Sequence, residues 1–289
     1  METKKPLIVS FSGGQTSAFM SAWLWSHKRE TYDIRFVFAN TGLESEATLQ
    51  FVRRVSEHFR FPVVWLESLP QTGRIGTGHS VSNYLSAKRH GEPFEAVIAK
   101  YGIPNLAFPH CTRELKINPI NSYARAVFPD GYDTAIGIRI DEIDRMSVNA
   151  KKNRLIYPLI TEIPTRREDV NKYWQSMPFR LGIQDYEGNC VTCWKKSMPK
   201  LRKIAYQNPG EFKFWVKMEA RYGNYVPESR RSRYLERGQS IPTRITPWRG
   251  GISVDDILNS SSDDYTPSGN SESCDIYAGC GDEAPDSTP

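Results

Sequence analysis

A strand pattern, two adjacent glycines and a helix pattern follow one another near the N-terminus. Leu7, Ile8 and Val9 form an apolar run, residues 16–27 have a helix pattern, and the link Ser12-Gly13-Gly14-Gln15 between them is short. Adjacent glycines allow positive φ and let a ligand approach the backbone closely. The N-terminus of the helix offers free N–H groups and the positive end of a dipole. This segment favours a phosphate-binding loop, with a tight strand-to-helix turn as the simpler alternative.

The first two-thirds of the chain alternate between strand and helix patterns. Such alternation is typical of an α/β fold with a doubly wound, mostly parallel sheet. Ligands of these sheets bind beyond the carboxyl ends of the strands, so we expect the loops Ser12–Gly14 and Asn40–Gly42 to border one crevice. The Gly-rich stretch around His79 is expected to be a loop. The expected strands are 7–11, 34–39, 63–66 and 134–138, and the expected helices are 16–27, 45–59, 115–127 and 166–177.

The lack of long apolar runs and the cysteine content indicate the cellular compartment in which the protein is expected. Within its 289 residues the chain has no apolar run of about 18 residues, and its N-terminus lacks the apolar stretch of a signal peptide. We therefore expect no membrane span and a cytoplasmic protein. In that compartment the five cysteines favour metal binding or catalysis over disulfides.

Charge is distributed unevenly along the chain. The net charge is +5, basic residues concentrate between 195 and 249, and an acidic, Ser-rich tail follows. A basic belt suits an anionic substrate or a nucleic acid, and it is also compatible with a solvated surface. The patterns predict a nucleotide-binding α/β domain over 1–185, a basic helical region over 186–258, and a flexible acidic tail over 259–289.

Several segments carry a resemblance to a known superfamily. The stretch SFSGGQTSA resembles the pyrophosphate loop of the PP-loop ATP pyrophosphatases, whose usual pattern is Ser-Gly-Gly-x-Asp-Ser. Ser12, Gly13, Gly14 and Ser17 match, and Thr16 stands where the family usually has Asp. The segments FVFANTGLESEATLQFV, HCTRELKINPI, AIGIRIDEIDRM and IYPLITEIPTRREDVNKYW are similar, in this order, to motifs of the phosphoadenosine phosphosulfate (PAPS) reductase branch. The resemblance covers about residues 7–202.

This resemblance implies a fold like that of the adenine nucleotide alpha hydrolases, an adenine nucleotide (ATP or PAPS) and Mg²⁺. Cleaving ATP between its α and β phosphates needs an anion cradle and nearby cations. The residues expected to act in catalysis are Arg113, Lys116, Arg139, Glu142 and Arg145. Those expected to bind the nucleotide are Ser12, Gly13, Gly14, Gln15, Thr16, Ser17, Asn40, Thr41, Gly42, Glu44 and Gly137.

The cysteines give a second signal. Cys190 and Cys193 form a Cys-x-x-Cys pair, a spacing that lets two thiolates bind one centre. Cys111 lies in a matching motif, and sulfonucleotide reductases with a four-iron, four-sulfur cluster have a similar arrangement, although here His110 replaces one cysteine. One interpretation is such a cluster, with His110, Cys274, Cys280 or a substrate as the fourth ligand. The others are zinc on His110 and the three cysteines, or a metal-free pair for redox or persulfide chemistry.

Two activities follow from these expectations. The first is an enzyme that cleaves ATP to AMP and pyrophosphate and adenylates a substrate for sulfur transfer. Its partners would be an adenine nucleotide, an anionic or nucleic-acid substrate and a sulfur donor, in a chain that can form oligomers. The second is a PAPS- or adenylylsulfate-type reductase, whose tail nucleophile has only a partial counterpart in Cys280-Gly281. A nucleotide-binding module without catalysis is the third alternative.

Overall fold

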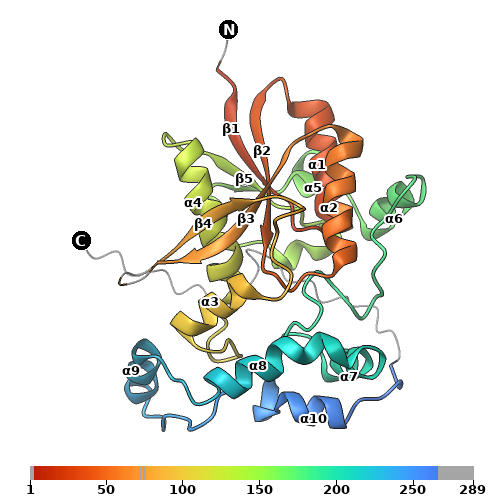
Figure 1. The fold of residues 1–289 in the computed structure, drawn as a ribbon. Coiled ribbons are helices and arrows are strands. Elements are labelled where there is room, and N and C mark those ends of the chain that lie inside the picture. Colours follow the sequence, from red (N-terminus) through yellow and green to blue (C-terminus); the bar gives the residue numbers. More distant parts are fainter. Residues whose placement is uncertain (1–2, 72, 74–75, 266–289) are drawn as a thin grey trace.

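The protein is an α/β structure built on one six-stranded sheet (Figure 1). A computed structural model describes residues 3–71, 73 and 76–265. The strand order is β4-β3-β2-β1-β5-β6, and every neighbouring pair is parallel except β3 and β4. The strands are β1 (Lys5–Ser10), β2 (Tyr32–Asn40), β3 (Val63–Pro70), β4 (Thr77–Ser82), β5 (Asp133–Ala135) and β6 (Leu155–Ile156). This confirms the predicted α/β class with a mostly parallel sheet.

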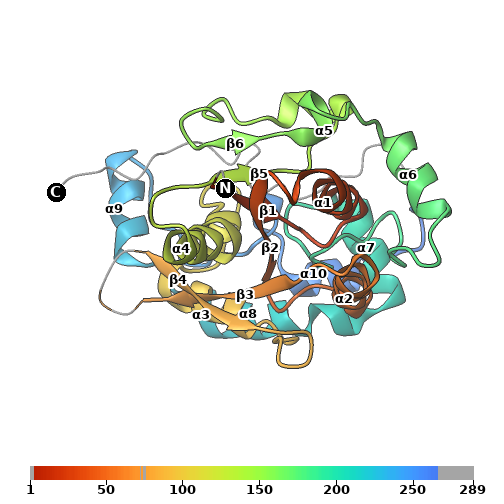
Figure 2. The ribbon, with the colours of Figure 1, turned by 90° about the horizontal axis from the view of Figure 1, so that it is seen from above.

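Helices cover both faces of the sheet, as Figure 2 shows from above. On one face, α1 (Gln15–Lys28) and α2 (Glu46–Phe59) pack on the side chains of Leu7 and Val9, with α6 (Arg167–Gln175) beside α1. On the other, α4 (Asn118–Val127) packs on Ile8 and its neighbours. The alternation of Leu7, Ile8 and Val9 between two cores follows from the two-residue period of a strand.

The order in which strands are added to the sheet changes direction at β1. Strands β2 and β3 follow on one side of β1, and β5 is added on its other side, with β6 beyond it. A doubly wound sheet binds its ligands at such a switch point. The loops after β1 and β5 therefore occupy the position at which a ligand is expected.

Several elements differ from the expectations: strand β6 was not predicted, and the expected strand 134–138 is the shorter β5. The Gly-rich stretch around His79 is strand β4, not a loop, because it pairs antiparallel with β3 at the edge of the sheet. Helix α3 (Glu92–Tyr101) was not predicted. The expected helix 115–127 is instead a π-helical segment, η1 (Arg113–Ile117), followed by α4, which has Pro119 in its first turn.

Helices of the C-terminal region form a layer beneath the carboxyl ends of the strands (Figure 1). Phe212 and Trp215 of this layer share a core with Phe94 of α3 and Leu115 of η1. The predicted basic helical region is thus packed onto the sheet domain. The remaining elements are η2 (Ile140–Arg145), α5 (Pro158–Thr161), α7 (Met198–Gln207), η3 (Pro209–Phe212), α8 (Lys213–Tyr222), α9 (Glu228–Glu236), η4 (Arg249–Gly251) and α10 (Val254–Asn259).

The described part of the acidic tail lies against the helical layer. The Tyr265 ring packs edge-on against Tyr186, and Asp263 forms an ion pair with Lys203. The rest of the predicted flexible tail, with Cys274 and Cys280, lies outside the described residues. Within the described residues, every helix is too short or too polar to cross a lipid bilayer.

Candidate functional site

The loop after β1 is folded around the hydroxyl group of Ser17. The Ser12 backbone N–H donates to Ser17 Oγ at 3.2 Å, and Ser17 Oγ donates to the Gly14 carbonyl at 2.9 Å. Gly13 has φ +82°, and a Cβ atom there would lie 2.8 Å from Cγ2 of Thr48 on α2. Only glycine therefore fits this position without strain, which is why the loop needs it.

The first turn of α1 lies open beside this loop. Gly14 is the N-cap residue, its backbone is extended, and no side chain caps the helix. A Cβ atom on Gly14 would have no neighbour closer than 3.7 Å. The first N–H groups of a helix have no partner within it, so an anion can bind them. The predicted loop residues Ser12 to Ser17 thus form one short segment that ends in the uncapped N-terminus of α1.

The segment after β5 contacts the loop at the switch point. A Cβ atom on Gly137 would lie 3.1 Å from Cα of Ser17, which shows how closely the two backbones approach. Just beyond, Arg139 Nη1 donates to Thr16 Oγ1 at 2.9 Å. Arg139 also forms an ion pair with Asp141 at 3.1 Å. This segment brings a guanidinium group to the edge of the loop.

Glu142 extends this charged network away from the loop. Its carboxylate pairs with Arg139 at 3.2 Å and also with Arg145. Three of the predicted catalytic residues are therefore connected, because Glu142 pairs with both Arg139 and Arg145. Arg113 lies elsewhere, in an ion pair with the buried Glu114 at 2.8 Å.

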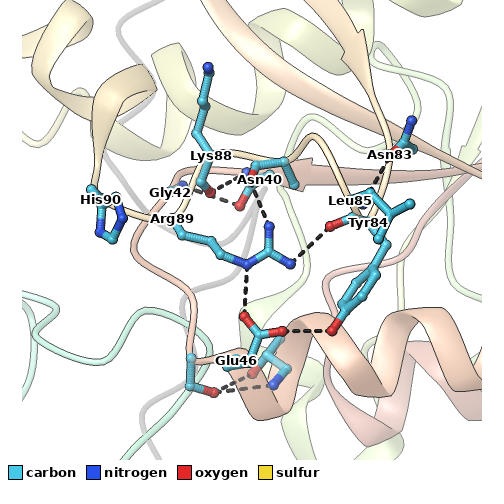
Figure 3. Close-up of polar contacts among 12 residues, drawn as sticks. Asn40, Gly42, Glu46, Asn83, Tyr84, Leu85, Lys88, Arg89 and His90 are labelled. Atoms are coloured by element: carbon cyan, nitrogen blue, oxygen red, sulfur yellow. Dashed lines mark hydrogen bonds and ion pairs between the residues drawn. The ribbon is translucent and has the colours of Figure 1, made fainter.

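The turn after β2 is held by Asn40 (Figure 3). Asn40 Nδ2 donates to Glu67 Oε1 at 2.8 Å and to the Lys88 carbonyl at 2.9 Å, and Asn40 Oδ1 accepts from the Gly42 N–H at 3.2 Å. Beside it, Arg89 joins Glu46 to the segment after β4. The amide of Asn40 is thus used within the protein, so its observed role is to shape the turn.

Glu44 joins this turn to a group of thiols. Its carboxylate accepts hydrogen bonds from the backbone N–H and the hydroxyl of Thr41, each at 2.9 Å. Burial raises the pKa of Glu44, and the positive charge of Lys116 offsets part of that rise. The Glu44 backbone also pairs with that of Cys190 in an isolated antiparallel bridge.

Cys111, Cys190 and Cys193 line one small cavity. The cavity has a volume of about 20 Å³ and is also lined by Lys116, Trp194 and Trp215. The Cys190 thiol hydrogen-bonds to Cys193, and the Trp194 indole N–H lies 3.4 Å from Cys111 Sγ. The sequence expectation that these cysteines lie together, although distant in the chain, agrees with this arrangement. Such a cavity has room for about one water molecule.

The two thiols of the Cys-x-x-Cys pair differ in acidity. Their hydrogen bond lowers the pKa of Cys193 to about 6 despite burial, and the charge of Lys196 adds to the lowering. The same hydrogen bond, together with burial, holds the pKa of Cys190 well above its usual range. A thiolate is the nucleophilic form of cysteine, so the direction of these shifts favours Cys193 as the nucleophile of the pair.

His110 lies apart from the cavity, although it precedes Cys111 in the chain. Its Nδ1 atom faces Arg230 of α9 at 3.1 Å, and its ring packs near Tyr101. Burial and the charge of Arg230 lower the pKa of His110 to about 3. The predicted set of His110 and three cysteines therefore does not meet at one point. Among the described residues, no group of three or more His, Cys, Asp or Glu is arranged to hold a metal ion.

Asn189 connects the thiols with the phosphate-loop candidate, a role that the sequence did not indicate. Its Nδ2 atom donates to the Ser12 carbonyl at 2.7 Å, and the next residue but one, Val191, donates through its N–H to Leu43. Lys196 was also missed as a neighbour of Cys193. The only local signal for both is their position next to the Cys-x-x-Cys pair.

Comparison with known proteins places the chain among relatives of viral and archaeal origin. No protein-family model matches the sequence. The chain is 31% identical over 293 aligned positions to the uncharacterized nin region protein ORF290 of Escherichia phage lambda, which covers 94% of this chain and 95% of the phage protein. It is 25% identical over 232 positions to an uncharacterized protein of Methanocaldococcus jannaschii, covering 75% of this chain and 41% of the archaeal protein. The chain belongs to the family of the phage lambda nin region protein ORF290.

Proposed function

We propose that this protein is a PP-loop ATP pyrophosphatase of the PAPS reductase-like branch. In this proposal ATP lies across the switch point with its phosphates on the loop Ser12–Ser17. The observation that carries it is the open first turn of α1 beside Gly13 and Gly14, with the guanidinium group of Arg139 held at the edge of the same loop. Backbone N–H groups, a helix N-terminus and an arginine together form an environment for phosphate.

The proposed chemistry is adenylyl transfer. An oxygen of the acceptor attacks the α-phosphorus of ATP, the bond to the bridging oxygen breaks, and pyrophosphate leaves with the bonding electrons. The loop stabilises the negative charge that develops on pyrophosphate, because its N–H groups are fixed before the reaction begins. Mg²⁺ would shield the charge of the phosphates, and the carboxylates of Asp141 and Glu142, which pair with Arg139, are the nearby described oxygen groups that could hold it.

The thiols suggest what consumes the adenylate. A sulfur nucleophile displaces AMP from the activated acceptor, and the electrons of the broken bond leave with AMP. Cys193 is the candidate carrier of that sulfur because its thiolate is stabilised by Cys190 and Lys196. It would take the sulfur from a persulfide donor, whose thiolate leaves, and attack by Cys190 on Cys193 would then release the product and leave a disulfide that an external thiol reduces. His110 does not line the cavity of the three thiols, and no described group of three or more His, Cys, Asp or Glu is arranged to hold a metal ion, so we assign no step to a cluster or to zinc.

Incubation with labelled nucleotides tests this proposal. With ATP labelled at the α-phosphate, we expect AMP and pyrophosphate in equal amounts, in the presence of Mg²⁺ and a nucleic-acid extract as acceptor. Sulfite released from PAPS in a parallel incubation would support the reductase instead. Nucleotide binding without either product would indicate a non-catalytic module.

A further inference from the structure

Besides the cavity lined by the thiols, the protein has a larger hollow beside the N-terminus of α1. It has a volume of about 450 Å³ and is formed by Gln15, α6 and the segment 180–184. The Trp174 indole N–H donates to the Gln15 carbonyl at 2.9 Å, so its wall is fixed to the end of the Ser12–Ser17 loop. This volume falls in the range of pockets that bind small molecules. The lining residues are Gln15, Asn171, Trp174, Gln175, Arg180, Leu181, Gly182, Ile183 and Gln184.

The residues that line this hollow suit a ligand with neutral polar and anionic groups. Four of its lining residues carry side-chain amides, namely Gln15, Asn171, Gln175 and Gln184, and no carboxylate is among its described lining residues. Asn171, Gln175, Arg180 and Gln184 are exposed at the hollow, and Gln15 is half-buried. Their donors and acceptors are therefore available to a ligand.

The combination of amides and one guanidinium group matches the chemistry of a nucleotide. A side-chain amide presents a donor beside an acceptor, which pairs with the hydrogen-bonding edge of a base. Guanidinium groups bind phosphate in a bidentate manner. Leu181 and Ile183 add apolar surface against which a base or sugar can pack.

We propose that this hollow binds a nucleotide unit, with its phosphate on Arg180 and its base edge on the amides. Because the hollow shares Gln15 with the loop, a unit bound there lies next to the proposed ATP site, and we assign it the role of adenylyl acceptor. That role as an acceptor site rests on the proposed function, whereas binding itself does not. The unit is either a free mononucleotide or one residue of a single-stranded nucleic acid.

Calorimetric titration of the full chain with each of the four nucleoside 5′-monophosphates, and with a tetranucleotide RNA, tests this site. We expect Arg180→Gln to weaken binding by about tenfold or more, the typical loss for a charge-assisted hydrogen bond. Gln175→Ala should weaken it less, by about threefold, since a neutral hydrogen bond is lost. Arg125→Gln is the matched control, because Arg125 is exposed on α4, on the opposite face of the sheet.

The possible outcomes distinguish a free nucleotide from a nucleic acid as the ligand. They also test this site independently of the proposed function. Tighter binding of the tetranucleotide assigns the unit to a nucleic acid, and equal or weaker binding assigns it to a free nucleotide. Absence of binding up to millimolar concentration, or binding that Arg180→Gln leaves unchanged, overturns the site. ATP binding is titrated separately: its absence beside Arg180-dependent nucleotide binding removes only the proposed function, and the reverse result removes only this site.

Discussion

Arg139 Nη1 donates to Thr16 Oγ1 at 2.9 Å, joining the segment after β5 to the first turn of α1. The resemblance places an aspartate at position 16 in related loops, where it would pair with such an arginine. Here the carboxylates come from Asp141 and Glu142, which both contact Arg139. In this protein Arg139 therefore pairs with carboxylates of its own segment, and its contact with position 16 is a hydrogen bond to a hydroxyl group.

Thr16→Asp is expected to lower pyrophosphate release from ATP by about tenfold, corresponding to about 1.4 kcal/mol. Arg139 already has two carboxylate partners, so a third would repel the phosphates more than it would orient the arginine. Thr16→Ser keeps the hydroxyl and serves as the control with near-normal activity. A rise in activity for Thr16→Asp would contradict this and would mean that threonine at this position has reduced the activity of the enzyme.

The two glycines of the loop should respond differently to alanine. Gly13→Ala forces a positive φ and a contact with Thr48, so we expect a loss of about 1–3 kcal/mol in the free energy of unfolding. Gly14 has a negative φ of −92° and open space around it, so Gly14→Ala should keep its stability and lose nucleotide affinity. Thermal unfolding and ATP titration of both variants measure this. Equal stability of the two would contradict the described loop geometry.

Among the three described cysteines, Cys193 should be the first to react with iodoacetamide. Its pKa of about 6 makes it largely thiolate at pH 7, whereas Cys190 remains a thiol until much higher pH. Peptide mass spectrometry of briefly treated, anaerobically purified protein should show half-maximal labelling of Cys193 near pH 6. Lys196→Met should move that midpoint upward, because it removes a nearby positive charge. Preferential labelling of Cys190 would reverse the assignment, and iron and zinc measured on the same sample test the metal alternatives.

Glu219 should make stability depend on pH. Burial raises the pKa of Glu219 to about 7, with the Val254 N–H donating to its carboxylate at 3.0 Å. The folded state therefore binds the proton more tightly than the unfolded state, whose pKa is near 4.5. The contribution is complete below about pH 4.5 and is lost as the pH rises through 7. Relative to Glu219→Gln, the melting temperature should fall over this interval, and a constant difference would exclude the effect.

Local patterns were sufficient to predict much of the fold. The apolar runs of β1 and β2 and the helical periods of α1 and α2 are properties of neighbouring residues, so they are readable from the sequence. Strand β4 was not, because Gly78, His79 and Ser80 lack the alternation of a strand and are ordered by pairing with β3. Pairing with the preceding strand, rather than the residues of the segment itself, decides this element.

The candidate site shows the same division. The grouping of Cys111 with the Cys-x-x-Cys pair was predictable, since each lies in a recognisable motif. The separation of His110 from that group was not, because it depends on Arg230, which lies 120 positions further along the chain. Asn189 and Arg180 likewise act through positions that only the folded chain brings beside the loop.

The structure of the protein in complex with the ATP analogue α,β-methylene ATP tests the central claim most directly. The account predicts that the β- and γ-phosphate oxygens lie within hydrogen-bonding distance of the backbone N–H groups between Gly14 and Ser17, with Arg139 against the phosphates. Phosphates bound away from this loop, or no bound nucleotide at saturating concentration, would contradict it.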